Sequence, residues 1–386
     1  MATFFLVLIY ITFVSLGLPD SLLGSAWPVL SRELGAPLSG AGVISFIITG
    51  GTIISSLLTD RLVRRLGTGK LTAVSVCMTA AALLGFSLAP GFWWLCLLAV
   101  PLGLGAGAVD AALNNYVALH YAARHMSWLH CFWGIGATAG PAILSLFLAH
   151  QSGWRKGYLA IAILQFCLTA ALFLTLPLWK KQDASAQASA SGAVQHTAHP
   201  LRLPLAKPVL LGFFCYCGIE ASTNLWAASY LTGLRGVSAQ AAAQWTSLFF
   251  LGITAGRLVT GFATIKFQAR TLMRVGQGCC LAGILFLLLP LPNIFAALGL
   301  ALIGLGCAPL YPCMLHETPR RFGEGAAQSL MGLQMASAYL GSTLVPPLIG
   351  LLAPALSLWV LPAVMLALLL MMTAACERVN LACPTK

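Results

Sequence analysis

Twelve long apolar stretches, separated by short polar segments, dominate the sequence. Each has about 20 residues or more, the length that an α-helix needs to cross a bilayer. Only helices and closed barrels can cross, because lipid cannot pair with open backbone groups. The sequence therefore predicts an all-α membrane protein whose twelve spans are roughly 4–30, 38–60, 70–89, 92–120, 126–150, 155–178, 207–233, 239–263, 271–290, 293–316, 325–352 and 355–376.

The composition favours the same class of protein. Only 8% of the residues are charged and 59% are hydrophobic, whereas a soluble domain carries about 25% charged residues. Such a chain cannot cover a surface that faces water. The N-terminal segment MATFFLVLIY has no basic region and no cleavage site of the signal-peptide kind, so we interpret it as the first span.

The net charge of +12 would fit a nucleic-acid-binding protein, but the positions of the basic residues favour another interpretation. If both termini are cytoplasmic, most of the 21 Lys and Arg residues fall in cytoplasmic segments. This is the positive-inside distribution of membrane proteins. We therefore expect an integral protein of a bacterial inner membrane, with both termini in the cytoplasm, the lipid bilayer as its surroundings and no nucleic-acid partner.

One long polar segment divides the chain into two halves of six spans. It is KKQDASAQASASGAVQHTAHPLRLP, and its Ala, Ser and Gln content is typical of a flexible linker. The halves resemble each other at an offset of about 201 residues: Gly103-Leu104-Gly105 corresponds to Gly304-Leu305-Gly306. Small residues recur where membrane helices pack closely. We expect a bundle over 1–179, a cytoplasmic linker over 180–206, and a second bundle with a short tail over 207–386.

Two features of the sequence resemble the major facilitator superfamily: its two six-span halves and a charged segment after the second span. Members of this superfamily are built from two parallel repeats of six helices, with a substrate site near the midplane between the halves. The segment Asp60-Arg61-Leu62-Val63-Arg64-Arg65 is similar to the cytoplasmic signature G-x-x-x-D-R-x-G-R-R, although Ser56 and Val63 replace two glycines. A solvated basic loop is the alternative, because exposed ion pairs contribute only ~0–1 kcal/mol. The resemblance implies gating by Asp60, Arg61, Arg64 and Arg65.

Three of the nine acidic residues, Asp20, Asp110 and Glu220, lie inside predicted spans. A carboxylate there costs roughly 2.5–3.5 kcal/mol on insertion scales, so it is a candidate functional residue. We expect these three to carry proton coupling, although a static neutralising partner is the alternative for Asp20. The other acids are expected in loops, at span ends or in the tail: Glu33, Asp60, Asp183, Glu317, Glu324 and Glu377.

Polar residues accompany the intramembrane acids at helical spacing. Asn114 follows Asp110 by four positions, and Asn224 follows Glu220 in the same way, so each pair shares a helix face. Interhelical hydrogen bonding is the alternative for the asparagines, and simple packing for His130. We expect Arg257 near the cytoplasmic end of its span, outside the ligand site. The predicted substrate-binding residues are Asn114, Asn115, His130, Trp133, Asn224, Trp226, Tyr311, Gln334 and Tyr339.

Asp20, Asp110 with Asn114, His130 ahead of F-x-x-x-G-A, and the segment GIEAS together resemble the fucose permease branch, the fucose/glucose:H⁺ symporters. By this resemblance Asp20 matches the first-helix coupling acid. Asp110 stands in place of a glutamate, and His130 in place of a glutamine. The resemblance implies H⁺-coupled symport of a monosaccharide-like solute, with Na⁺ as the other candidate ion.

Proton-driven efflux of drugs or metabolites, and a non-transporting membrane sensor, remain alternatives because the fold alone does not decide between them. No nucleophile–base pair, metal-ligand spacing or phosphate loop is present in the sequence. We therefore expect neither an enzyme nor a protein with a metal or cofactor. A small-molecule substrate and a monomeric state are expected.

Overall fold

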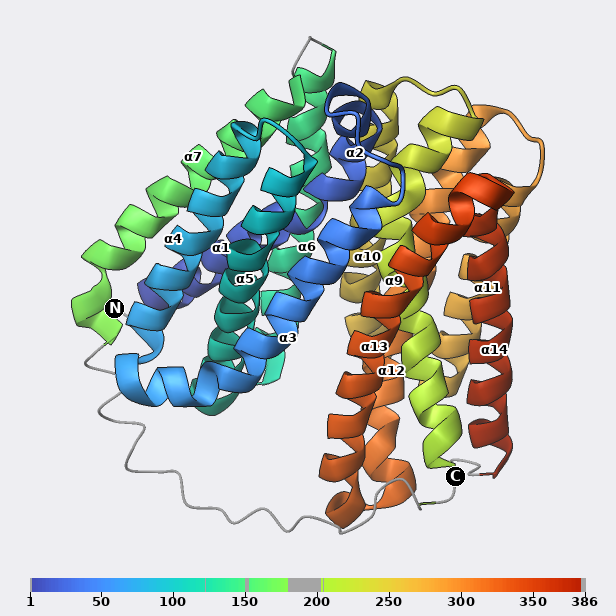
Figure 1. Cartoon of the computed structure of the whole chain (residues 1–386). Helices are drawn as coiled ribbons and strands as arrows, with labels where there is room; N and C mark the ends of the chain where they lie inside the picture. The colour runs from blue at the N-terminus through green and yellow to red at the C-terminus, as the bar shows by residue number, and fades with distance from the viewer. Residues whose placement is uncertain (1, 122, 150–152, 180–202, 204, 383–386) are drawn as a thin grey trace. The chain divides into compact units, whose positions relative to one another are not determined.

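The computed structural model describes residues 2–121, 123–149, 153–179, 203 and 205–382. For residues 2–4, 60, 118–119, 123–124, 126–127 and 324–329 it describes the backbone alone. Every regular element in this part of the chain is a helix (Figure 1). The helices are α1 Ala2–Asp20, α2 Leu22–Glu33, α3 Gly40–Leu66, α4 Thr68–Ser87, α5 Phe92–His120, α6 Ala123–Leu148, α7 Gly153–Leu174, α9 Ala206–Leu234, α10 Ala239–Ala263, α11 Ala269–Leu288, α12 Asn293–Phe322, α13 Glu324–Leu356 and α14 Val360–Ala382.

Among the described residues, eleven helical segments are long and apolar enough to cross a membrane. The first, Phe5–Glu33, combines α1 and α2. Helix α9 corresponds to the predicted span 207–233 and is 29 residues long, but it is not among the eleven. It carries polar residues, including Glu220 and Asn224, that dilute its apolar character. The all-α membrane architecture that the sequence predicts is confirmed.

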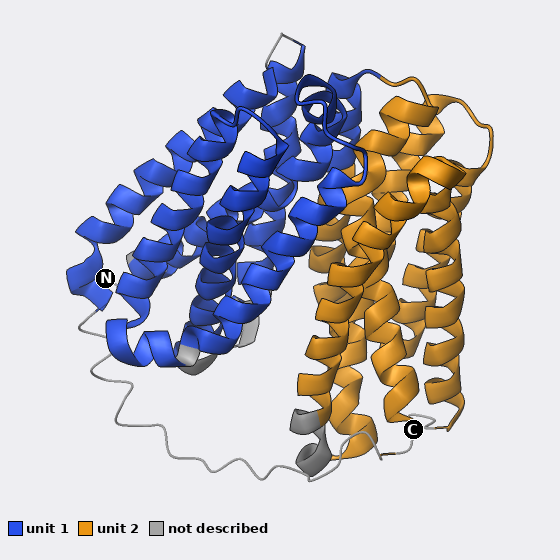
Figure 2. Cartoon of the chain, viewed as in Figure 1, with its two compact units in different colours: residues 1–192, 238–247 blue, residues 193–237, 248–386 orange. Residues whose placement is uncertain are grey.

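The chain forms two compact units, coloured separately in Figure 2. Unit 1 comprises residues 1–192 with 238–247, and unit 2 comprises residues 193–237 with 248–386. The predicted linker over 180–206 lies almost entirely outside the described residues. The predicted domain boundaries therefore stay a prediction.

Unit 1 is held together by helix pairs that approach to backbone contact. Helix α1 packs against α6, α3 against α5, and α4 against both α5 and α7; Figure 1 shows α4 and α7 side by side. A Cβ atom on Gly136 would overlap the carbonyl oxygen of Val14, and one on Gly103 would overlap that of Ile48. Without side chains at these glycines, the backbones pack directly against one another, as is typical of membrane helices.

Unit 2 repeats these contacts with other residues. A Cβ atom on Gly341 would overlap the carbonyl oxygen of Phe214, between α13 and α9, and one on Gly304 would overlap that of Phe249, between α12 and α10. Gly304 and Phe249 both lie 201 positions after their unit 1 counterparts. The sequence repeat thus corresponds to equivalent helix seams in the two units. We call the α3–α5 and α10–α12 contacts the glycine seams.

Several helix ends differ from the predicted spans. Helix α3 continues to Leu66, so the predicted loop of Asp60 to Arg65 forms its last turns. Helix α12 ends at Phe322 and α14 at Ala382, beyond the predicted ends at 316 and 376. Glu317 and Glu377 therefore lie within long helices, and Glu317 is 4% exposed. Polar and charged residues lowered the apparent hydropathy of these ends, although the helices continue through them.

Candidate functional site

The carboxyl group of Asp20 is held at a break between two helices. Pro19 and Asp20 end α1, and α2 begins at Leu22. Proline favours such a break because it lacks a backbone donor. Ser21, between the helices, donates its hydroxyl to the carbonyl oxygen of Ala137 in α6 at 2.8 Å. The break leaves Asp20 exposed next to the buried Pro19.

Trp133 of α6 donates its indole N–H to Asp20 Oδ2 at 2.8 Å. The close approach of α1 and α6 makes this contact, since a Cβ atom on Gly17 would overlap the carbonyl oxygen of Trp133. The sequence analysis predicted Asp20 for proton coupling and Trp133 for substrate binding, but it did not predict a contact between them. The structure brings the two predicted residues into direct contact.

Asp110 and Asn114 of α5 form a second hydrogen-bonded pair. Asn114 Nδ2 donates to Asp110 Oδ1 at 2.9 Å, so the shared helix face predicted from their spacing is confirmed. Asn114 Oδ1 is buried and accepts no hydrogen bond from a described residue. Asp110 also interacts electrostatically with Asp20. We call Asp20, Asp110, Asn114 and Trp133 the acid cluster of unit 1.

Two other predicted residues of unit 1 lie on the helices of the acid cluster. His130 is half-buried on α6, and its ring packs edge-on against Phe13 with centroids 6.1 Å apart. Asn115 is exposed, one position beyond Asn114 on α5. Their assignment to substrate binding stays a prediction.

Unit 2 holds a cluster around two phenol rings. Tyr216 of α9 and Tyr311 of α12 lie with ring centroids 5.8 Å apart, and the Tyr311 hydroxyl donates to Met335 Sδ at 3.0 Å. Glu220 and Arg257 interact electrostatically with both tyrosines, and Tyr339 interacts with Tyr311. We call Glu220, Arg257, Tyr216, Tyr311 and Tyr339 the tyrosine cluster of unit 2.

Arg257 is the residue of this cluster that the sequence analysis set aside. We expected it near the cytoplasmic end of its span and outside the ligand site. In the structure its charge acts on Tyr311, one of the predicted substrate-binding residues. Arg257 lies within the candidate span Ala239–Ala263, where a charge is by default a functional candidate. Its place outside the ligand site stays a prediction.

Three further predicted residues of unit 2 occupy different surroundings. Asn224 is half-buried on α9, one turn after Glu220. Trp226 is fully buried and donates its indole N–H to the carbonyl oxygen of Pro346 at 2.8 Å. Gln334 is also fully buried and donates to the Thr318 hydroxyl at 2.8 Å. The contacts of Trp226 and Gln334 join helices, and their role in binding stays a prediction.

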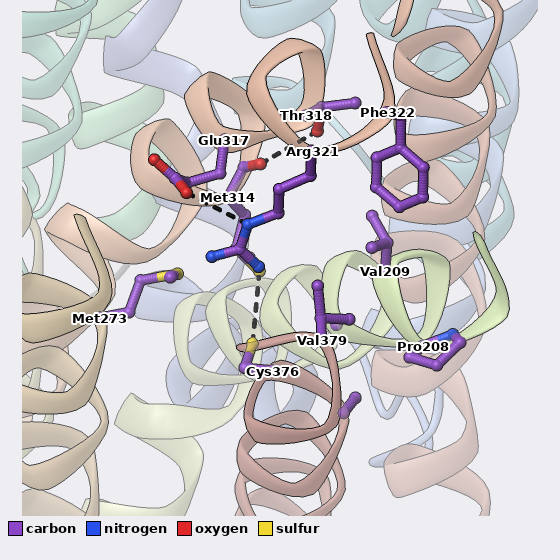
Figure 3. Close-up of a pocket in the computed structure, with 12 residues that line it drawn as sticks. Pro208, Val209, Met273, Met314, Glu317, Thr318, Arg321, Phe322, Cys376 and Val379 are labelled. Atoms are coloured by element: carbon purple, nitrogen blue, oxygen red, sulfur yellow. Dashed lines mark hydrogen bonds and ion pairs between the residues drawn. The ribbon is translucent and has the colours of Figure 1, made fainter. Parts of the chain in front are cut away.

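A partly open pocket lies in unit 2 among the start of α9, the start of α11 and the last turns of α12 and α14 (Figure 3). Its charged lining residues form an ion pair in which Arg321 Nε lies 3.1 Å from Glu317 Oε2, with side chains 7% and 5% exposed. Arg321 also donates to Asn380 Oδ1 at 2.7 Å. None of the predicted site residues lines this pocket.

The predicted gating residues lie at the end of α3. The side chain of Asp60 lies outside the described residues, whereas Arg61, Arg64 and Arg65 are exposed on the last turns of the helix. The latch that the resemblance implies stays a prediction.

Comparisons with known proteins identify similar sequences over both units. The family model of the Major Facilitator Superfamily matches residues 9–245 and 210–379. The glucose/mannose transporter GlcP of Bacillus subtilis is 23% identical over 352 residues, which is 88% of this chain and 86% of that protein. "Bypass of stop codon protein 6" of Saccharomyces cerevisiae is 26% identical over 285 residues, 67% of this chain and 56% of the yeast protein's length.

A solved structure shows the same fold at lower identity. The D-xylose-proton symporter superposes with a TM-score of 0.73 at 14% sequence identity, over 95% of this chain and 96% of that chain. At this identity the likeness concerns the arrangement of helices. It agrees with the all-α membrane architecture described above.

Proposed function

The chain belongs to the Major Facilitator Superfamily, and we propose that this transporter is an H⁺-coupled symporter of a small polyhydroxylated solute such as a monosaccharide, working by alternating access. The acid cluster of unit 1 carries the proposal. Two carboxyl groups that interact inside membrane spans, Asp20 and Asp110, provide a place for a proton within the bilayer.

The chemistry of the cluster suits reversible proton binding. A like charge close by favours the protonated form of a carboxyl group, whereas a hydrogen bond to the carboxylate favours the ionised form. Asp20 has both influences, from Asp110 and from the indole of Trp133. A solute that displaces one of these partners shifts the balance between the two forms. Solute binding and proton binding then depend on each other.

Two observations support a sugar-like solute. The chain is similar over most of its length to a protein named as a glucose/mannose transporter. The predicted site residues include amide, indole and phenol groups, among them Asn114, Trp133 and Tyr311, which combine apolar faces with hydrogen-bonding atoms, as small-molecule sites do. Amides and phenols pair with hydroxyl groups, and indole rings pack against the C–H faces of sugars.

The test uses de-energised cells in unbuffered medium that express the full chain. Glucose, mannose or fucose is added and the external pH is recorded for the wild type, Asp20→Asn and Asp183→Asn. Symport predicts alkalinisation with at least one sugar in the wild type and in Asp183→Asn, which removes a carboxylate from the predicted linker. Asp20→Asn should insert normally and give no response, because the amide cannot carry the proton.

One result would contradict proton-coupled symport, and another would contradict the role of Asp20. Sugar uptake that requires Na⁺ and moves no protons would exclude proton coupling. An undiminished pH response in Asp20→Asn would leave symport standing but remove Asp20 from the coupling path.

A further inference from the structure

The backbone of α1 contains a carbonyl oxygen that loses its ordinary donor to a proline. In an α-helix each N–H donates to the carbonyl oxygen four residues earlier, so the ordinary donor for Ser15 is residue 19. Residue 19 is a proline, which has no N–H. Ser15 is buried, at 6% exposed. An unpaired carbonyl in such a place is costly, so a donor from another helix is expected.

A side chain of α7 supplies this donor. Gln165 Nε2 donates to the carbonyl oxygen of Ser15 at 2.8 Å. The oxygen of the same amide is also paired, because the Thr79 hydroxyl of α4 donates to Gln165 Oε1 at 2.8 Å. The opposite orientation of the amide would place its oxygen against that of Ser15, so the two bonds fix one orientation. Gln165 is 1% exposed and connects α1, α4 and α7 in the interior of unit 1.

This contact lies just before Asp20 in the chain, and a second contact lies just after it. Ser21 donates its hydroxyl to the carbonyl oxygen of Ala137 in α6 at 2.8 Å. The segment from Ser15 to Ser21 is therefore held on both sides of the proline. Asp20 lies between the two contacts, where Trp133 donates to its carboxyl group. Contacts of this kind hold a functional side chain in the geometry that its own partner requires.

Unit 2 lacks both the proline and the amide. Helix α9 runs unbroken from Ala206 to Leu234 and has no proline near Glu220. Its carbonyl oxygens there keep their helical donors. The last helix of unit 2, α14, packs against α9, and its buried residues from Val360 to Met372 are all apolar. The buried amide of Gln165 thus accompanies the break in α1 and is not a general feature of the repeat.

We propose that Gln165 is a positioning residue for Asp20: its amide replaces the missing N–H of Pro19 and holds the break in α1 where Trp133 donates to Asp20. The proposal rests on the function proposed above. Without the amide, the carbonyl oxygen of Ser15 has no donor, and the break moves to pair it elsewhere. The carboxyl group of Asp20 then leaves the indole, and solute binding and proton binding become less dependent on each other.

The closing experiment compares Gln165→Met with Gln277→Met in cells. Methionine is close to glutamine in length but has no amide, and Gln277 is a buried glutamine of α11, in unit 2. Two rates are measured with glucose, mannose and fucose in turn: the alkalinisation of the medium, and the exchange of labelled for unlabelled sugar. Exchange returns the loaded symporter with its proton, so it requires no proton release.

The ratio of alkalinisation to exchange is the decisive quantity. It should fall about fivefold in Gln165→Met, the effect of one hydrogen bond, and stay at the wild-type value in Gln277→Met. A purely structural role of Gln165 would lower both rates together and leave the ratio unchanged. If Gln165→Met fails to fold, Thr79→Val replaces it. This variant keeps the amide but removes the hydroxyl that orients it, so the ratio should fall by a smaller factor.

A second measurement reports on Asp20 without any solute. A hydrophobic carbodiimide adds to protonated carboxyl groups, and mass spectrometry of the purified protein gives the rate of this addition at Asp20. The hydrogen bond from Trp133 favours the ionised carboxylate. Gln165→Met should therefore react faster at Asp20 than the wild type and Gln277→Met.

A third measurement tests whether Gln165 replaces the N–H of Pro19. Pro19→Ala restores an N–H for the carbonyl oxygen of Ser15. Gln165→Met should lower the temperature of thermal unfolding in the wild-type background and lower it less in the Pro19→Ala background, because the alanine N–H now pairs with Ser15. Equal losses in the two backgrounds would show that Gln165 acts by packing alone and would refute the proposal.

The readouts separate this proposal from the proposed function. If no sugar moves protons in the wild type but the carbodiimide and unfolding results are as expected, the positioning role stands and the symport function fails. An unchanged rate of addition at Asp20 in Gln165→Met refutes the positioning role. If symport is present and the ratio is unchanged in Gln165→Met, the effect of Gln165 on coupling is refuted.

Discussion

The carboxylates of the two units have different partners. In the acid cluster of unit 1, neutral N–H groups of Trp133 and Asn114 donate to Asp20 and Asp110. In unit 2, Glu317 is bound by Arg321, Glu377 is bound by Arg274, and Glu220 shares its surroundings with Arg257. A neutral donor stabilises a carboxylate modestly, whereas an arginine stays charged at any pH of interest and keeps its partner ionised.

The partners of a carboxylate also depend on where it lies within its unit. Glu33, at the end of α2 in unit 1, lies 3.0 Å from Arg155 and accepts from the indole of Trp154. Glu33 thus has both an arginine and a neutral donor, as an acid near the end of its helix. The two units are built on one repeat, yet neutral N–H groups donate to the two carboxylates of the acid cluster in unit 1, whereas Glu317 and Glu377 of unit 2 are paired with arginines.

The largest expected effect tests the fixed charges of unit 2. Arg321→Gln removes the buried cation of Glu317 and leaves the exposed Arg320, 3.5 Å from Glu317 Oε1, as its remaining partner. Breaking a buried pair costs about 3–5 kcal/mol, and we expect a loss toward the lower end of this range. Thermal unfolding of the purified protein should show a large loss of stability, most of which the double variant Glu317→Gln/Arg321→Gln should restore. Equal instability of the single and double variants would show that Arg321 acts through Asn380 and not through the pair.

The next effect tests the neutral donors of unit 1. Trp133→Phe keeps an aromatic ring but removes the N–H that Asp20 accepts. A hydrogen bond to a charged group contributes about 1.5–3 kcal/mol, so sugar-driven proton uptake should fall by roughly tenfold or more. Trp27→Phe is the matched control, because the indole of the buried Trp27 donates to the backbone carbonyl of Leu38 at 3.1 Å, and this variant should lower stability alone. Equal proton uptake in Trp133→Phe and the wild type would remove the indole from the coupling mechanism.

The smallest effect tests the repeat that underlies the comparison. Gly103→Ala and Gly304→Ala each force a methyl group against a backbone carbonyl in a glycine seam. Such overpacking costs about 1–3 kcal/mol, and the two losses should be similar if the seams are equivalent. Gly50→Ala and Gly278→Ala meet nothing within 4 Å and serve as controls in the same units. Unequal losses, read from thermal unfolding, would show that one unit relies less on its seam.

What the sequence predicted correctly depends on relations within one helix or one repeat. The hydrophobic lengths identify the membrane helices, the 201-residue offset identifies equivalent seams, and the four-residue spacing of Asp110 and Asn114 predicts their contact. Each follows from helix geometry, which the local sequence determines. These relations were sufficient to predict the fold and the Asp110–Asn114 pair of the acid cluster.

What it missed depends on contacts between helices. Asp20 and Trp133 are 113 positions apart, and their hydrogen bond exists because α1 and α6 approach at Gly17. The surroundings of Arg257 likewise come from α9 and α12. Glu317 looked like the start of a loop, but Arg321 one turn later neutralises it inside α12. Tertiary packing determines these contacts, and the spacing of residues along the chain does not reveal them.

The glycine seam of unit 1 also bears on how the protein is inserted during synthesis. Thr52 of α3 donates to the carbonyl oxygen of Gly103, 51 positions later in the chain. Because the chain is made from its N-terminus, α3 leaves the ribosome before α5, which carries this carbonyl oxygen. The Thr52 hydroxyl also lies 3.0 Å from the carbonyl oxygen of Ile48 in its own helix. A newly inserted α3 can therefore satisfy the Thr52 hydroxyl within its own helix while it is surrounded by lipid. The hydroxyl needs no water partner before α5 packs against α3 and the glycine seam forms.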